Sequence, residues 1–119
     1  MTALSINHLN LSVRDIPGTR EFLRTWFGFT ATMERDALSI LEDAQGFVLT
    51  LMPLKDDDPS SYPGSFHVGF YVPVETVEAL HAAMTAAGLD PGEISRLHRG
   101  TMFYVTDPSG ILIEVGSPR

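Results

Sequence analysis

The sequence predicts an α+β fold built from paired βαβββ units, with a mixed curved sheet and the helices on its outer face. Two observations carry this prediction. An order of strand, helix and strands occurs twice in the 119 residues, and similar residues recur at constant distances between the two halves. Internal similarity of this kind indicates a duplicated unit. We expect a single domain over residues 1–119, with one unit at about 1–54, a linker at 55–64 and a second unit at about 65–119.

The repeat is defined by two offsets. His67 stands 59 positions after His8 (67 − 8), and Asp107 stands 64 positions after Asp43 (107 − 43). The first offset holds before the predicted helices and the second after them, so the difference falls in the loops. A chance similarity between two amphipathic α/β stretches is the alternative explanation.

The first half contains one helix and three recognisable strands. Its opening strand alternates apolar and polar residues, and apolar side chains then recur at helical spacing up to Gly28, which is placed to end the helix. The expected elements are a strand at 6–13, a turn at 14–18, a helix at 19–28, and strands at 37–43 and 47–52.

The second half repeats this order after a linker rich in Asp, Pro and Ser. The expected elements are a strand at 66–72, a helix at 76–88, and strands at 101–107 and 111–116. The turn sequences DAQG and DPSG predict a hairpin in each half. The fourth strand of each unit is not recognisable. His81 lies off the apolar stripe of the second helix, so we interpret it as a surface residue.

Composition excludes several classes of function. The net charge of −7 argues against nucleic-acid and anionic-membrane partners, since both need a basic surface. The absence of cysteine removes disulfides, thiolate metal sites and cysteine nucleophiles. No stretch approaches the roughly 20 apolar residues that span a bilayer, and the first ten residues lack the features of a signal peptide. We therefore expect a cytoplasmic protein.

Four polar side chains are expected on the sheet face that the helices leave uncovered. Successive residues of a strand point to opposite faces. The residues assigned to the core face are apolar: Leu9, Leu11, Val13, Phe66, Val68, Phe70, Val72, Phe103, Val105, Ile111, Ile113 and Val115. The alternation then places His8, His67, Tyr104 and Glu114 on the other face. If the two units form one curved sheet, that face is the inside of a cup.

Two imidazoles and one carboxylate are a ligand set suited to Fe(II), Mn, Co, Ni or Zn. Three protein ligands leave coordination positions open, which is typical of a catalytic ion. We therefore predict a divalent metal, of open identity, held by His8, His67 and Glu114. Each residue taken alone is more often a half-exposed surface position. Their occurrence on one face, with the histidines at equivalent positions of the repeat, favours the metal site.

Three segments resemble the vicinal oxygen chelate superfamily, which includes glyoxalase I, extradiol dioxygenases, fosfomycin-resistance enzymes and bleomycin-resistance proteins. They are INHLNLSVRDI, FHVGFYV and FYVTDPSGILIEV, and the last is the most specific. The resemblance implies a half-barrel cup and supports His8, His67 and Glu114 as metal ligands. It also implies a homodimer, with cups that are often shared between the two chains.

Departures from the family pattern argue against some of the activities found in the superfamily. Thr50 occupies the position at which glyoxalase I carries a fourth, acidic ligand, which argues against a lactoylglutathione lyase. Tyr104 matches the tyrosine that extradiol and fosfomycin-resistance enzymes place ten residues before the glutamate, so it is the candidate catalytic residue; a cup-lining tyrosine is the alternative. The short chain argues against the extradiol enzymes. The fosfomycin-specific loops have no clear counterpart, and bleomycin-binding members generally lack the metal triad.

The predicted function is a metal-dependent enzyme of the glyoxalase/dioxygenase type. Its substrate is a small metabolite that chelates the ion through adjacent oxygens, with dioxygenase, lyase and transferase chemistry left open. The residues that could contact this substrate are Asn10, Thr50, Arg96, His98 and Arg99. For the last three, a solvated loop is the alternative. The alternative function is a metal-free small-molecule or drug binding protein of the bleomycin-resistance type.

Overall fold

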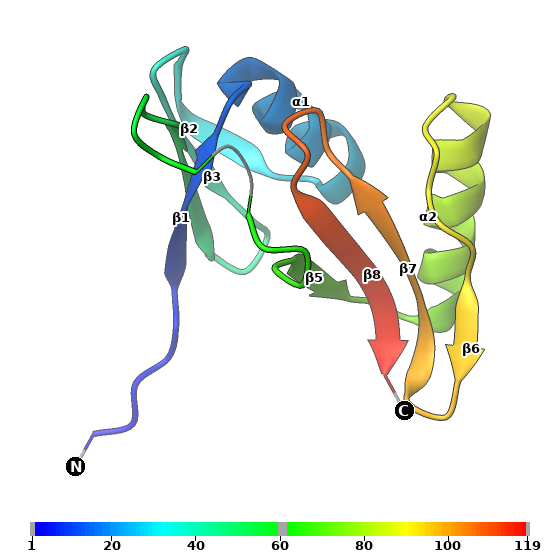
Figure 1. Ribbon diagram of the computed structural model, residues 1–119. Helices are drawn as coiled ribbons and strands as arrows, with labels where there is room; N and C mark the ends of the chain where they lie inside the picture. Colours follow the sequence, from blue (N-terminus) through cyan, green and yellow to red (C-terminus); the bar gives the residue numbers. More distant parts are fainter. Residues whose placement is uncertain (1, 60–61, 119) are drawn as a thin grey trace. The chain divides into compact units, whose positions relative to one another are not determined.

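The computed structural model describes residues 2–59 and 62–118. The chain divides into two compact units at about residue 60, and each contains a four-stranded mixed sheet and one helix (Figure 1). The first unit consists of β1 (His8–Val13), α1 (Ile16–Phe27), β2 (Thr30–Arg35), β3 (Leu38–Glu42) and β4 (Val48–Pro53). The second consists of β5 (Val68–Tyr71), α2 (Val74–Ala86), β6 (Ser95–Leu97), β7 (Gly100–Thr106) and β8 (Leu112–Pro118). The predicted α+β fold of two βαβββ units is confirmed.

The strand pairing repeats with the offsets of the sequence. The sheets have the orders β1-β4-β3-β2 and β5-β8-β7-β6. Leu9 pairs with Leu49 in parallel β1 and β4, and the residues 59 and 64 positions later, Val68 and Ile113, pair in parallel β5 and β8. The duplication is therefore present in the register as well as in the sequence. A cup lined by both units stays a prediction.

In the first unit, α1 packs on β2, β3 and β4. The large core side chains are apolar: Leu11, Val13, Phe22, Leu23, Leu41, Leu49 and Leu51. The smaller polar side chains of Thr19 and Ser39 are buried as well. The predicted turn at 14–18 is wrong, because the helix already begins at Ile16. The side chain of Asp15 accepts a hydrogen bond from the Gly18 N–H, and Pro17 occupies the first turn, so the sequence DIPG caps the helix.

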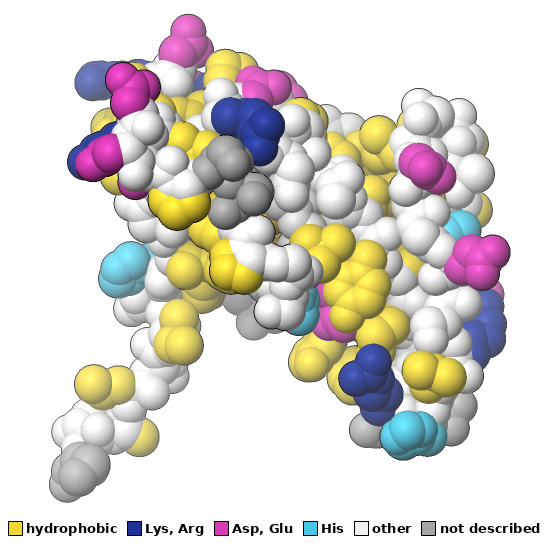
Figure 2. Space-filling view, in the orientation of Figure 1, with side chains coloured by type: hydrophobic (Ala, Val, Ile, Leu, Met, Phe, Trp, Pro, Cys, Tyr) yellow, Lys and Arg dark blue, Asp and Glu magenta, His cyan; other side chains and the backbone are white. Residues whose placement is uncertain are grey.

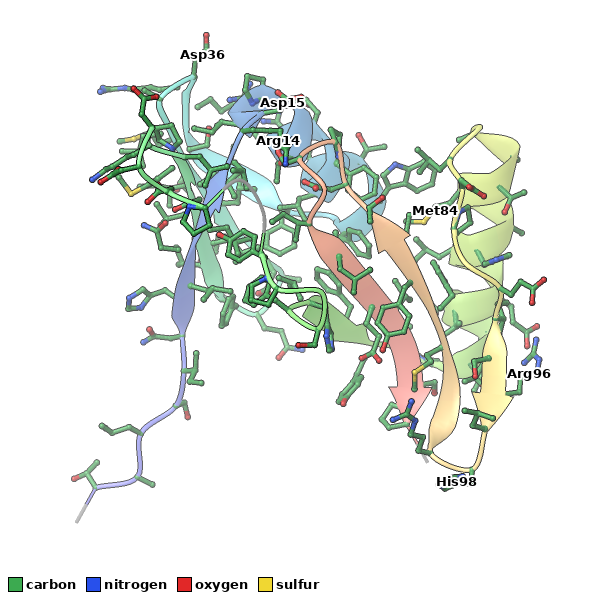
Figure 3. All side chains as sticks on the ribbon, viewed as in Figure 1. Arg14, Asp15, Asp36, Met84, Arg96 and His98 are labelled. Atoms are coloured by element: carbon green, nitrogen blue, oxygen red, sulfur yellow. The ribbon has the colours of Figure 1, made fainter. Side chains whose placement is uncertain are left out.

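In the second unit, α2 packs on β7 and β8, and Met84 points from the helix toward the sheet (Figure 3). The interpretation of His81 as a surface residue holds only in part, because the residue is half-exposed and also contacts the core. Its ring lies edge-on to the buried ring of Phe103, at a centroid distance of 5.1 Å, and Nε2 lies 2.9 Å from the main-chain oxygen of Gly92. His81 therefore belongs to the packing of α2 on the sheet.

The two predicted hairpins are confirmed and have the same turn structure. Oδ1 of Asp43 accepts the N–H groups of Gln45 and Phe47, and β3 and β4 pair antiparallel on either side. Oδ1 of Asp107 likewise accepts two N–H groups, from the residues two and four positions later, between β7 and β8. Each aspartate thus fixes the register of the strands that carry the candidate site.

The core assignment holds for most positions on the helix-facing side of the sheets. Leu9 is an exception, because it lies at the start of β1 and keeps 37% of its surface exposed. The four residues predicted for the core face at 66–72 are half-buried: Phe66, Val68, Phe70 and Val72. Before β1 the chain is extended, and the side chains of Leu4 and Ile6 are exposed to solvent (Figures 1 and 2). No helix in the described part of the chain is long and apolar enough to cross a membrane.

Candidate metal centre

Tyr104 and Glu114 lie opposite each other on β7 and β8, on the face of the sheet away from α2. Their neighbours on the helix-facing side, Phe103 and Val115, are buried. The Tyr104 hydroxyl donates a hydrogen bond of 3.0 Å to Oε1 of Glu114. The ring of His67 lies edge-on to the Tyr104 ring at a centroid distance of 5.8 Å. The second unit therefore brings together three of the four residues predicted for one face.

The hydrogen bond to Glu114 raises the pKa of Tyr104 above its ordinary value. Partial burial and the negative charge of Glu114 act in the same direction, and the positive charge of Arg99 acts weakly against them. Tyr104 is thus a neutral hydrogen-bond donor at physiological pH. The arrangement suits a proton donor better than a base.

His67 is held in a form suited to metal binding. Its Nδ1 lies 3.0 Å from the main-chain oxygen of Ser65. A carbonyl oxygen only accepts, so the proton of the neutral ring sits on Nδ1 and the lone pair on Nε2. Metal-binding histidines typically donate their other ring nitrogen to an oxygen in this way. No described residue forms a hydrogen bond with Nε2.

Gly69 lies beside the Glu114 carboxylate. It pairs with Glu114 across β5 and β8, and a Cβ at this position would lie 3.4 Å from Oε2 of Glu114. With Oε1 bonded to Tyr104, the second oxygen lies beside a strand that carries no side chain there. In the sequence, Gly69 is recognisable as a glycine inside a strand, which often marks the close approach of another group.

The first unit presents a different set of residues at the equivalent positions. His8 corresponds to His67, and its Nδ1 lies 2.8 Å from Oδ1 of Asn7. The partners of the second unit are replaced: Asn10 pairs with Thr50, where Gly69 pairs with Glu114. The Asn10 amide lies 3.0 Å from the sulfur of Met52. The first unit therefore contributes one imidazole and no carboxylate.

In the described residues, 2–59 and 62–118, no group of three His, Cys, Asp or Glu side chains comes together as a metal-binding cluster. His67 and Glu114 share a sheet face in the second unit, whereas His8 belongs to the first. The convergence of all three on one ion stays a prediction. In donor chemistry the residues fit a divalent transition metal, since they offer two imidazoles and one carboxylate.

The candidate substrate-binding residues of the second unit separate into two groups. Arg96 forms an ion pair with Glu78 of α2, with Nη1 at 3.1 Å from Oε1, so it lies on the helix side of the sheet (Figure 3). Arg99 follows β6 in the turn to β7, and its charge reaches Tyr104. His98 is exposed at the tip of the same turn (Figure 3). Of the three, Arg99 is the residue whose charge acts on the pKa of Tyr104.

The fold and these side chains define a duplicated βαβββ protein that carries imidazole and carboxylate donors on open sheet faces. The chain belongs to the Glyoxalase/Bleomycin resistance protein/Dioxygenase superfamily, which matches residues 5–115. This match confirms the resemblance seen in the sequence. A comparison with curated protein sequences gives no match.

Solved structures share the fold over nearly the whole chain. A possible glyoxalase from Bacillus cereus is 38% identical, with a TM-score of 0.82 over 96% of this chain and 99% of that one. A lactoylglutathione lyase from Agrobacterium tumefaciens is 19% identical, with a TM-score of 0.79 over 98% and 96% of the two chains. The fosfomycin resistance protein FosX from Listeria monocytogenes is 21% identical, with a TM-score of 0.77 over 100% and 95%.

Proposed function

We propose that the protein is a metal-dependent enzyme that acts on a small metabolite bearing two adjacent oxygens. His8, His67 and Glu114 would hold the ion. The observation that carries the proposal is the hydrogen bonding of the two repeat-equivalent histidines, each of which directs Nδ1 to an oxygen and leaves Nε2 for a ligand. Dioxygenase, lyase and transferase reactions all remain within this proposal.

The ion would act as a Lewis acid that polarises the substrate oxygens. The chain's own residues then have separate roles. Tyr104 is protonated and donates its single hydroxyl proton to Glu114. On substrate binding the hydroxyl would turn from Glu114 and donate this hydrogen bond, or the proton, to a developing oxyanion. Arg99 adds positive charge near Tyr104, which suits an anionic group on the substrate.

The fold is known to accommodate a divalent cation. A variant of FosX from Listeria monocytogenes is 19% identical to this chain, with a TM-score of 0.78 over 99% and 93% of the two chains, and its structure contains Mn(II) and 1S,2S-dihydroxypropylphosphonic acid. The ligand of that protein carries hydroxyls on adjacent carbons. Support for a metal ion in this chain comes from its own histidine and carboxylate donors. The similarity to the FosX variant adds that the fold is compatible with a bound metal ion.

Elemental analysis of protein purified without chelators tests the proposal. We expect a stoichiometric divalent metal in the wild type, and loss of most of it in His67→Ala and Glu114→Gln. Matched controls are His98→Ala, at the exposed β6–β7 tip, and Glu93→Gln, an exposed residue before β6, and both should retain the metal. Metal-free wild-type protein, or full metal content in both site variants, would contradict the proposal.

A metal-free binding protein is the second candidate. It is favoured by the first unit, where Thr50 and Ile40 occupy the positions of Glu114 and Tyr104 and the half-exposed face is more apolar. In that case His8→Ala should leave the affinity for an apolar ligand intact. The homodimer and the cytoplasmic location expected from the sequence belong to both proposals.

A further inference from the structure

The two candidate histidine ligands are oriented by different kinds of acceptor. Nδ1 of His67 bonds to a main-chain oxygen, that of Ser65, whereas Nδ1 of His8 bonds to a side-chain oxygen, Oδ1 of Asn7. The main-chain acceptor of His67 remains when the Ser65 side chain is substituted. The acceptor of His8 depends on one residue and is removed by substituting it.

Asn7 departs from the pattern of its strand. Odd-numbered positions in this stretch are apolar from Leu9 onward, and the residue 59 positions after Asn7 is Phe66. Asn7 is therefore polar where both the alternation and the repeat expect an apolar side chain. Its main chain is fixed to the sheet, because its carbonyl oxygen accepts the N–H of Val48 at 3.0 Å. A fixed backbone and a short side chain give the amide oxygen a defined position beside the imidazole.

We propose that Asn7 is a positioning residue that holds neutral His8 as the Nδ1–H tautomer, with the Nε2 lone pair free for a ligand. An amide oxygen only accepts, so the proton of the bond comes from the imidazole. The tautomer is a property of the chain alone. Its consequence for metal binding rests on the proposed function.

Long-range ¹H–¹⁵N NMR of the imidazole nitrogens in metal-free full-length protein tests this directly. The spectrum is recorded at a pH about two units above the ordinary imidazole value of about 6.5, where the ring is neutral. The chain contains its own references. His67 should appear as Nδ1–H, and His81 as Nε2–H because its Nε2 donates to Gly92.

We expect His8 to be Nδ1–H in the wild type and to shift toward the Nε2–H form in Asn7→Ala. Asn7→Asp keeps an acceptor oxygen and should restore the wild-type tautomer. Ser65→Ala is the matched control in the second unit, and because the main-chain acceptor remains, His67 should not change. An Nε2–H tautomer of His8 in the wild type would mean that the amide presents its NH₂ group, and would overturn the proposal. An unchanged tautomer in Asn7→Ala would do the same.

A Zn²⁺ titration separates this inference from the proposed function. Loss of the partner of a ligating histidine typically weakens metal binding by roughly tenfold to a hundredfold, and we expect such a loss in Asn7→Ala but not in Ser65→Ala. If the wild type does not bind Zn²⁺, the proposed metal site fails, while the NMR result still decides the role of Asn7. A wild-type Zn²⁺ affinity in Asn7→Ala would overturn the positioning role for the metal.

Discussion

The Tyr104 hydroxyl bonds to Oε1 of Glu114 across directly paired positions of β7 and β8. One residue is the candidate proton donor and the other a candidate metal ligand, and the hairpin fixes the register that joins them. The bond occupies one carboxylate oxygen. The other lies beside Gly69, the position on β5 that has no side chain.

Tyr104→Phe removes this bond without removing a proposed ligand. We expect stoichiometric metal to remain, because His67 and Glu114 are intact. The free energy of unfolding should fall by about 1 kcal/mol, the usual net value of one hydrogen bond. Chemical denaturation and elemental analysis measure the two effects. Tyr71→Phe is the control, since Tyr71 is 75% exposed on β5 and should change neither. Loss of metal in Tyr104→Phe would show that the tyrosine is required to hold the carboxylate.

The two hairpin aspartates offer a comparison of equivalent positions. Asp107 accepts the N–H groups of Ser109 and Ile111 at 3.0 and 2.7 Å and is 6% exposed, whereas Asp43 makes the same bonds with more exposure. We expect Asp107→Ala to lower the free energy of unfolding by about 3 kcal/mol and Asp43→Ala by about 1 to 2 kcal/mol, because hydrogen bonds to a buried charge are the strongest.

Urea denaturation of both variants checks this order. Asp107→Asn keeps an acceptor oxygen and should recover part of the loss. Asp36→Ala is the control, since Asp36 is exposed in the β2–β3 turn and points away from the sheet (Figure 3). Equal decreases in the free energy of unfolding of the two alanine variants would show that burial does not determine how much these aspartate hydrogen bonds stabilise the fold.

Stability should depend on pH through Glu34 in β2. A hydrogen bond from Arg24 of α1, aided by the charges of Arg24 and Arg20, lowers the pKa of Glu34 below its ordinary value of 4.5. A carboxylate with a lowered pKa stabilises the folded state above its unfolded pKa, and this contribution disappears as the pH falls through the folded pKa. The stabilisation by Glu34 is therefore lost in acidic solution, below pH 4.5.

Urea midpoints measured between neutral pH and the acidic range test this dependence. Glu34→Gln should lower the midpoint at neutral pH and show a smaller further decrease on acidification than the wild type. Glu42→Gln is the control, because Glu42 is exposed at the end of β3 and forms no ion pair with a described residue. Identical pH profiles for Glu34→Gln and the wild type would contradict the role of the ion pair.

The sequence was sufficient for the duplicated fold because the repeat is carried by turns and alternating strands. It was insufficient for β2 and β6. β2 contains Glu34, which turns toward Arg24 of the helix, and its register shifts between Ala31 and Met33, so no clean alternation exists. β6 has only three residues. The start of α1 could have been predicted from the sequence, since Asp15 followed by Pro17 is a capping pattern.

For the candidate site, alternation placed Tyr104 and Glu114 correctly because the hairpin between them fixes the strand pairing. Contacts that depend on loop conformation or on an unrecognised strand could not be predicted. The bond from His67 to Ser65 is a contact of the first kind, and the position of Arg96 on the helix side depends on β6. Asn7 could not be assigned a role from the sequence alone. Its side chain becomes a candidate acceptor only when His8 is considered as a ligand whose Nδ1 requires a hydrogen-bond partner.

The expected sharing of cups in a homodimer can be tested by co-expressing two variants that each lack one proposed metal ligand. In the proposed site, the second unit would supply His67 and Glu114, and the first would supply His8. In a dimer of His8→Ala with Glu114→Gln, a site built from the two chains would have one copy with both changes and one copy with none. A site built within one chain would be damaged in both copies.

We expect the co-expressed heterodimer, purified through two different affinity tags, to regain about half of the wild-type metal per dimer, while each variant alone contains almost none. Co-expression of His67→Ala with Glu114→Gln is the control. Both changes then lie in the second unit, so neither the shared nor the single-chain arrangement damages only one copy, and no metal should return. Heterodimers of the first pair that also lack metal would place all three ligands within one chain, provided that the wild type binds the ion.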